Sequence, residues 1–317
     1  MCCGKNVKHT AFVLIELLAS AFIVGIFVPV LLGLLKQTSD RVIMMYDQRC
    51  AVQKILSAES LLKLPVFYCG YGMPSEAAEY QKSFQNIQTE PFSWEGPISV
   101  NSFNGRENAL LKTAYAKSCS VYTTAKISRS SQGTVQLNKN LPSDNLKASS
   151  AAIPQNVKNY LLFGGMSPFS QPLCVRNIYK KEITLNTPNG NQFSIPEIET
   201  LYLFCALKVY ARDGKLYTRD FRASGDQPRV DGIADIRFYL DEENEEKKLT
   251  VYILASGNVK NNGHKIHLLD FAEDSTNSQL ISEWKNLDAS TLLYASKTVW
   301  SLPNCVRNGN FPQNTAE

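Results

Sequence analysis

The sequence predicts an α+β fold in which one long N-terminal helix lies against an antiparallel β-sheet. Two observations carry this prediction: an apolar run from Phe12 to Leu35 that continues into an amphipathic helical pattern, and a series of strands between Thr200 and Ser256. A helix and a sheet that each have one apolar face bury those faces by packing on each other. With 317 residues, the chain is long enough to form a large hydrophobic core outside the apolar run.

The apolar run has the length of a membrane span. Residues 12–35 number 24, and only Glu16 among them carries a charge. The preceding residues 1–11 contain two lysines and no acid, so this leader is expected to stay in the cytoplasm. The run is too long for the apolar core of a cleaved secretory signal, and no small-x-small cleavage site follows it. A single-pass membrane anchor is therefore predicted.

The helical pattern continues beyond the apolar run as an amphipathic segment, residues 36–64. Apolar residues recur there at spacings of three and four, and charged residues stand between them: Asp40, Asp47, Lys54 and Glu59. The helix is expected to end at Leu64, because Pro65 and the segment CGYG follow. Residues 12–64 would then form one helix of roughly 80 Å. Such a helix suits a subunit that packs beside other helices.

Residues 65–317 are expected to form a globular head. Gly, Pro, Ser and Asn are frequent in residues 70–190, which predicts a loop-rich insertion with short β-like runs. Residues 200–256 predict an antiparallel meander of four strands, since two runs flank an Asp-Gly turn at Asp213 and two more flank the polar connection DEENEEKK. The C-terminal extension, residues 257–317, is expected to belong to the same domain.

Two further features of the head follow from the pattern. In the strand from Ile233 to Leu240, one alternating set is wholly apolar and is expected to form the buried face: Ala234, Ile236, Phe238 and Leu240. The C-terminal extension predicts one helix over residues 277–287 and one strand over residues 292–300.

Six cysteines follow the apolar run. An even number is compatible with disulfides in an oxidising compartment, and the sequence does not choose among the possible pairings. Buried free thiols are the alternative. The six residues are Cys50, Cys69, Cys119, Cys174, Cys205 and Cys305.

Residues 108–181 are basic, with ten Lys or Arg and one acid. Interleaved with Tyr and Phe, they suggest contacts to nucleic acid by phosphate neutralisation and base stacking. A solvated basic face that complements an acidic surface is the alternative, and it is favoured because nothing in the sequence brings these residues onto one surface. The candidate contact residues are Lys112, Lys117, Lys126, Arg129, Lys139, Lys180 and Lys181.

Known catalytic motifs are missing from the sequence, which contains no G-x-S-x-G, Walker or Cys-x-x-Cys pattern. His264 and His267 fall in a turn-and-strand pattern that does not bring them together as metal ligands. The polar segment DEENEEKK, residues 241–248, is rich in oxygen ligands but lacks the alternating ligand spacing and the fixed glycine of a calcium loop. The sequence predicts no catalytic residue, no cofactor and no metal site, and a membrane-anchored enzyme without a known motif stays open as an alternative.

The segment AFVLIELL, which follows the basic leader, resembles the prepilin N-terminal motif of type IV pilins and of type II secretion pseudopilins. This resemblance implies that a prepilin peptidase cuts between Ala11 and Phe12 and methylates the new α-amine of Phe12. It also implies that Glu16 is needed for filament assembly. The family has Gly before the cut, where this chain has Ala11.

A second resemblance concerns the head. The segments LYLFCALKVYARDGKLYTRDF, VDGIADIRFYLD and LTVYILAS are similar to the sheet of PilW-type minor pilins and J-type minor pseudopilins. The resemblance implies a pilin-like fold and a non-catalytic subunit, held in the bacterial inner membrane with its head in the periplasm and later extracted into a filament. Implied partners are other pilins or pseudopilins, the prepilin peptidase, the inner-membrane assembly platform and the lipid bilayer. A tip adhesin or DNA-binding pilin is the alternative within this family.

The position of Glu16 fits this resemblance. A lone carboxylate in hydrocarbon is unfavourable by a few kcal/mol. The α-amine that cleavage would create at Phe12 is a cation, and it could pair with Glu16 of a neighbouring subunit. The alternative is a glutamate that reaches the cytoplasmic interface from a simple membrane anchor.

Overall fold

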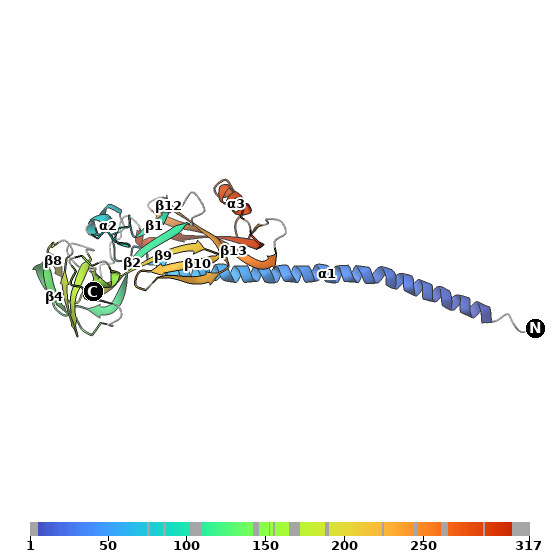
Figure 1. Ribbon diagram of the computed structural model, residues 1–317, viewed down its shortest axis with the longest axis horizontal. Coiled ribbons are helices and arrows are strands. Elements are labelled where there is room, and N and C mark those ends of the chain that lie inside the picture. Colours follow the sequence, from blue (N-terminus) through green and yellow to red (C-terminus); the bar gives the residue numbers. More distant parts are fainter. Residues whose placement is uncertain are drawn as a thin grey trace, which may run out of the picture.

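The computed structural model is an α+β structure in which one long helix projects from a β-rich head (Figure 1). The helix, α1 (Asn6–Phe67), is apolar in its first half and lies along the head from Asp47 to its end. The sheets of the head are antiparallel except for one parallel strand pair, β14 beside β15. The structure describes residues 6–74, 77–84, 87–101, 109–141, 146–151, 153–154, 156–164, 172–187, 190–223, 225–243, 246–260, 266–287 and 289–305.

Helix α1 ends at Phe67, three residues later than predicted. Pro65 lies inside its last turn, where a proline removes only one backbone hydrogen bond and has a φ that is compatible with a helix. Val66 is buried in the core, which holds this last turn in place. Gly70, with φ +77°, then redirects the chain in the turn that follows.

The largest sheet has nine strands in the order β1-β2-β9-β5-β6-β7-β4, with β10 beside β9 and β11 beside β10. Its strands are β1 (Ile98–Asn101), β2 (Leu110–Tyr122), β4 (Gln132–Gln136), β5 (Tyr160–Phe163), β6 (Leu173–Tyr179), β7 (Glu182–Asn186), β9 (Thr200–Arg212), β10 (Lys215–Asp220) and β11 (Asp226–Asp231). The second sheet has the order β12-β13-β15-β14, from β12 (Ile233–Glu243), β13 (Glu246–Lys260), β14 (Ile266–Leu268) and β15 (Thr291–Ser301). A small third sheet pairs β3 (Ile127–Ser130) with β8 (Phe193–Ile195). The remaining elements are α2 (Ala77–Phe84), α3 (Ser278–Lys285) and the short 3₁₀ helices η1 (Val157–Asn159) and η2 (Pro303–Cys305).

The main core lies between α1 and the strands of both large sheets. From α1 it receives Ala51, Ile55, Ala58 and Leu62, each at most 3% exposed. These residues are spaced by four, three and four, so they form one stripe of the helix. A helix covered by a sheet along its C-terminal half was predicted, and the structure confirms this packing from Asp47 onward, whereas Val42, Ile43 and Tyr46 of the predicted amphipathic segment are exposed.

The predicted four-strand meander over residues 200–256 is wrong as a single sheet. The hairpin of β9 and β10 forms as expected, with Asp213 and Gly214 in its turn at positive φ. However, β12 and β13 belong to the second sheet, and the unpredicted strand β11 pairs with β10. Gly232, at φ +77°, lets the chain pass from one sheet to the other, and its amide N–H donates to the Gly214 carbonyl at 2.7 Å.

The buried face expected for β12 is also partly wrong. A bulge between Ile233 and Asp235 puts Ile233 in the core with Ile236 and Phe238. Asp235 is 5% exposed beneath α3 and accepts hydrogen bonds from Trp284 Nε1 at 2.7 Å and Arg237 Nε at 2.8 Å. Leu240 is instead 38% exposed. Because the helix α3 covers the second face of this sheet, side chains on both faces of β12 are buried. The alternation of apolar and polar residues therefore does not predict which side chains of β12 are buried.

Most of the polar segment DEENEEKK belongs to the strands and not to a loop. In the register of β12 and β13, Asp241 lies opposite Lys248 and Glu242 lies opposite Lys247. The C-terminal extension matches its prediction: α3 and β15 form, and β15 lies inside the second sheet beside β13. Strand β15 is therefore hydrogen-bonded directly to the earlier strand β13.

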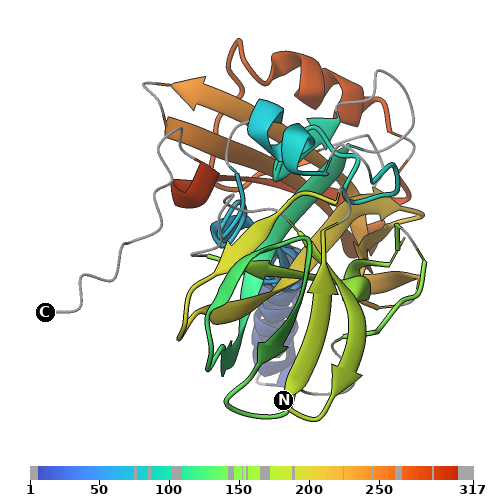
Figure 2. The same ribbon diagram turned by 90° about the vertical axis from the view of Figure 1, so that its left-hand side faces the viewer.

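The segment predicted to be loop-rich, residues 70–190, contains strands β1 to β7 and the helix α2. Strands β3 to β8 enclose a second core, which includes Val135, Leu161, Leu185 and Phe193. We call residues 127–195 the distal lobe, because it lies at the end of the head away from the start of α1 (Figure 1). In Figure 2, the green strands of this lobe face the viewer and α1 recedes behind them.

Candidate functional site

The exposed part of α1 is the most unusual surface of the molecule. The large apolar side chains of residues 13–35 are at least 45% exposed, and an apolar window of 18 residues in this helix has none of its members buried. This is one helix long and apolar enough to cross a membrane, and it extends freely from the head (Figure 1). Exposure continues from Val42 to Tyr46, before the helix meets the head.

Glu16 is exposed in this apolar segment. The hydroxyl of Ser20 donates to the Glu16 backbone carbonyl at 2.7 Å, and no ion pair joins the Glu16 carboxylate to another described residue. The nearest part of the helix that is buried by the head is Asp47, 31 residues further along, or roughly 45 Å at 1.5 Å per residue. A cation for Glu16 therefore has to come from outside the head. Ala11 and Phe12 lie in α1, and their side chains are outside the described part of the structure.

Asp47 attaches α1 to the head at the point where the two meet. Its side chain is 1% exposed and accepts hydrogen bonds from the backbone N–H groups of Asn258 and Val259, the latter at 3.0 Å. The Tyr294 hydroxyl donates to the same carboxylate at 3.0 Å. Burial and the Asp47 charge both raise the pKa of Tyr294 above its ordinary value. The contact is close, since a Cβ added to Gly257 would lie 2.1 Å from Asp47 Oδ2.

Two other charged residues of α1 also bind the head. Lys54 Nζ donates to the Ser256 carbonyl at 2.6 Å, and the Thr298 hydroxyl donates to Glu59. From the sequence, these residues were expected only to stand between the apolar positions, and no contact with the head was predicted for them. One signal could have found them: Asp47 and Lys54 are seven residues apart, so both follow the same helical stripe as Ala51 and Ala58. Polar anchors thus alternate with small apolar residues along the docked face.

The seven basic residues proposed for nucleic-acid contact do not form one group. Lys112, on β2, lies over the Trp94 ring at 6.0 Å, and Lys117 is exposed further along the same strand. The other five are exposed on or beside the distal lobe: Lys126, Arg129, Lys139, Lys180 and Lys181. None of these five forms an ion pair with another residue in the described ranges. The structure therefore places part of the predicted set on or beside the distal lobe.

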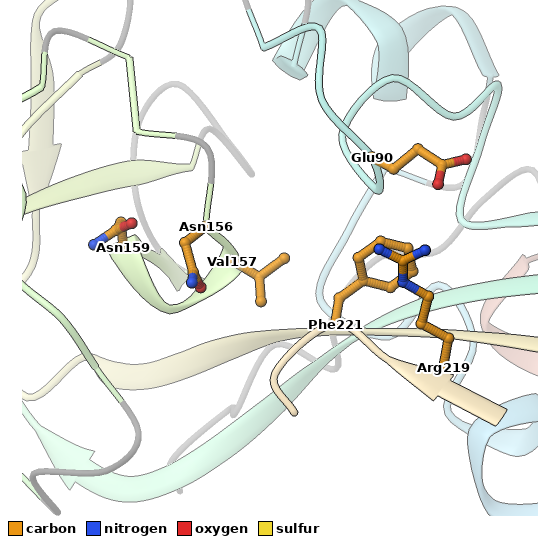
Figure 3. Close-up of a pocket in the computed structure, with 6 residues that line it drawn as sticks. All are labelled: Glu90, Asn156, Val157, Asn159, Arg219 and Phe221. Atoms are coloured by element: carbon orange, nitrogen blue, oxygen red, sulfur yellow. The ribbon is translucent and has the colours of Figure 1, made fainter. Parts of the chain in front are cut away.

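A pocket of about 550 Å³ opens beside η1 and β10 (Figure 3). Glu90 at its rim is paired with Lys208. Burial opposes ionisation of Glu90, but the Lys208 ammonium outweighs this effect and the pKa of Glu90 lies below its ordinary value. An ionised carboxylate held in this way is poorly suited to proton transfer at neutral pH. The lining residues are Glu90, Asn156, Val157, Asn159, Arg219 and Phe221.

The polar groups of the pocket are mostly engaged within the protein. Asn156 Oδ1 accepts from the Lys158 amide at 2.9 Å, and Asn159 Nδ2 donates to the Lys147 carbonyl at 2.6 Å. The Arg219 guanidinium lies 5.2 Å from the centre of the Phe221 ring. These contacts shape the wall of the pocket and stabilise the junction between η1 and the sheet.

Metal ligands do not cluster in the described part of the chain, where no group of three His, Cys, Asp or Glu residues is placed to hold an ion. His267 stacks on the Tyr294 ring with 5.2 Å between the ring centres. His264 lies outside the described residues. The His267 ring therefore contributes to the packing around Tyr294, next to the attachment of α1.

A scan against models of known protein families, a search of characterised proteins and a search of solved structures each found no match. The functional conclusion therefore depends on the chemistry and geometry of the chain itself. Its distinctive features are the exposed apolar half of α1, the single carboxylate within it, and the polar attachment of its other half to the head.

Proposed function

We propose that this chain is a minor pilin or minor pseudopilin, a non-catalytic subunit that primes or caps assembly of a type IV pilus or a type II secretion pseudopilus. The observation that carries the proposal is helix α1, whose exposed apolar half holds one carboxylate and whose last turns, from Asp47 onward, pack one face against the sheets of the head. The resemblance of AFVLIELL to the prepilin motif supports the same conclusion.

The isolated carboxylate favours a subunit that assembles over a simple anchor. No cation in the described part of the head lies within reach of Glu16. A charged side chain in a membrane normally marks a functional contact. In the proposed filament, cleavage between Ala11 and Phe12 creates the α-amine of Phe12, which pairs with Glu16 of a neighbouring subunit. The carboxylate is then unfavourable in the single subunit and compensated after assembly, so it sets the register between helices.

The continuous helix supports transfer of the subunit from membrane to filament. Asp47 begins the docked segment 12 residues after Leu35, which holds the head roughly 18 Å from the end of the apolar run. We infer that residues 1–11 lie in the cytoplasm and the head in the periplasm until the subunit leaves the inner membrane. The prepilin peptidase, the assembly platform, other pilins and the bilayer are the partners in this scheme.

The distal lobe favours a position at the filament tip. In Figure 1 this lobe extends beyond the C-terminal end of α1, along the direction of the helix. Subunits in a helical filament stack along that direction, so a lobe at this end occupies the space of the next subunit. A subunit at the tip has no such neighbour, which is compatible with a priming or capping role.

The mass of the N-terminal peptide tests the proposal. The full-length protein is isolated from membranes of cells with and without a prepilin peptidase, and its intact mass and N-terminal peptide are measured. We expect a chain that begins with N-methylated Phe12 only when the peptidase is present. A chain that keeps residues 1–11 in both strains would contradict processing at Ala11 and would favour a simple membrane anchor.

A second candidate function is binding of nucleic acid at the filament tip, and the exposed basic residues of the distal lobe favour it. Lys180→Glu should weaken binding of duplex DNA by the full-length protein in detergent and reduce the slope of affinity against salt by about one, because one phosphate contact is lost. The matched control is Lys63→Glu, an exposed lysine on α1. Equal DNA binding by both variants would exclude this role for Lys180.

A further inference from the structure

Two cysteine side chains meet where the end of α1 approaches the end of β15. Cys69 follows α1 by two residues, and Cys305 closes η2 just after β15. Their exposed fractions are 1% and 0%. The Cys305 thiol donates to the Cys69 carbonyl oxygen at 3.3 Å, and the Cys69 thiol donates to the Pro97 carbonyl oxygen at 2.9 Å. Two cysteines separated by 236 positions in the sequence are therefore in contact in the core.

The surrounding backbone holds these segments close. Asn304 Nδ2 donates to the Phe67 carbonyl at 2.8 Å, which joins the last residue of α1 to η2. Gly70 has φ +77°, and a Cβ added there would lie 2.6 Å from the Asn304 carbonyl oxygen and 3.0 Å from Cys305 Sγ. Only glycine allows this approach. The close approach of the two segments that contain Cys69 and Cys305 is thus built into the turn.

We propose that Cys69 and Cys305 form a disulfide that links the C-terminal end of α1 to the end of the second sheet. Formation of the S–S bond removes one proton and one electron from each thiol. The two electrons reduce the disulfide of a thiol oxidoreductase to its dithiol through a mixed-disulfide intermediate. The supply of this oxidant rests on the periplasmic position of the head under the proposed function.

The burial of both sulfurs determines when the bond forms. Desolvation by burial, together with the neighbouring Cys305, raises the pKa of the Cys69 thiol, so little reactive thiolate exists in the folded protein at neutral pH. Exchange with an oxidoreductase therefore takes place during folding, before η2 closes over Cys69. Once formed, the bond is shielded from reductants by the same core.

The disulfide has a mechanical consequence for the proposed function. A filament subunit is drawn out of the membrane through its helix, and the force on α1 has to pass into the head. The polar contacts of Asp47 and Lys54 hold the near end of the docked segment. A covalent bond at Cys69 holds its far end, and it closes a long loop that restricts the unfolded chain.

Peptide mapping under non-reducing conditions tests the pairing. The full-length protein is extracted from cells with its free thiols alkylated under denaturing conditions. We expect a linked peptide pair that contains Cys69 and Cys305, and an alkylated Cys50.

Cys69→Ala and Cys305→Ala should each lower Tm by on the order of 10 °C, and the double variant should be no less stable than either one. The matched control is Cys50→Ala. Dithiothreitol present during unfolding should lower the Tm of the unmodified protein, but it should not lower the Tm of the three variants that lack Cys69, Cys305 or both.

Refolding separates this proposal from the proposed location of the head. The full-length protein is refolded in detergent in a glutathione redox buffer and mapped again. Absence of the linked pair after refolding, with no effect of dithiothreitol on Tm, would overturn the disulfide. If the pair forms on refolding but both thiols are alkylated in protein taken from cells, the pairing stands and the periplasmic location is overturned.

Discussion

Glu16→Ala is expected to abolish incorporation of this chain into a filament while its membrane insertion and N-terminal processing continue. Alanine removes the carboxylate that pairs with the α-amine of Phe12 on a neighbouring subunit under the proposed function. Insertion should be slightly favoured, because a charge leaves the apolar run. The measurement compares the amount of this chain in sheared filaments with the amount in membranes, and we expect a loss of at least tenfold from the filament fraction, corresponding to about 1.4 kcal/mol or more.

Two variants control for the helix itself. Ser20→Ala removes a hydroxyl one turn further along, which donates only to the Glu16 carbonyl, and it should assemble normally. Glu16→Gln keeps the size of the side chain and removes its charge, and it should fail as Glu16→Ala does. Assembly of both Glu16 variants at the level of the unmodified protein would contradict the ion-pair mechanism. Activity in cells without any dependence on Glu16 would favour the membrane-anchored enzyme.

Asp47→Ala is expected to destabilise the attachment of α1 to the head by about 3–5 kcal/mol. The substitution leaves the Val259 and Asn258 amides and the Tyr294 hydroxyl without their acceptor in a site that is 1% exposed. Thermal unfolding of the full-length protein in detergent measures the effect, and Tm should fall by on the order of 10 °C. A second approach to the same contact is Gly257→Ala, whose Cβ would collide with the Asp47 carboxylate.

Asp40→Ala is the matched control, because Asp40 is exposed and stands seven residues earlier on the same helix. Its effect should be within about 0.5 kcal/mol. The effects of Asp47→Ala and Gly257→Ala should not add, since Asp47→Ala removes the side chain with which the new methyl group collides. Equal values of Tm for Asp40→Ala and Asp47→Ala would show that the buried hydrogen bonds do not stabilise the junction.

Local patterns in the sequence predicted the elements whose structure depends on near neighbours. The run from Phe12 onward and the spacing of apolar residues after Lys36 predict a long helix, and α1 extends from Asn6 to Phe67. The Asp-Gly pair at 213 and 214 predicts the turn between β9 and β10. The helix α3 and the strand β15 also appear where their periodicity predicts them.

The distal lobe was not predicted, because its strands are short and not all of them alternate between apolar and polar residues, although β7 (EITLN) does. In β4 only Val135 is buried, and the polar residues around it resemble a loop in sequence. Its stability comes from pairing with β7 and from the core that β3 to β8 enclose together. Such pairing joins residues about fifty positions apart, and no local pattern encodes it.

The sequence by itself determined that this chain has a long N-terminal helix with one charge in its apolar run and a head of strands with two faces to bury. Only the tertiary structure decided that β12 and β13 form part of a second sheet after Gly232, that Asp47 and Asp235 are buried, and that Cys69 contacts Cys305. The physical reason is that periodicity records which side of an element is apolar. The partner that covers a side is chosen by contacts between distant segments, and a buried carboxylate is stable only where those segments supply its hydrogen-bond donors.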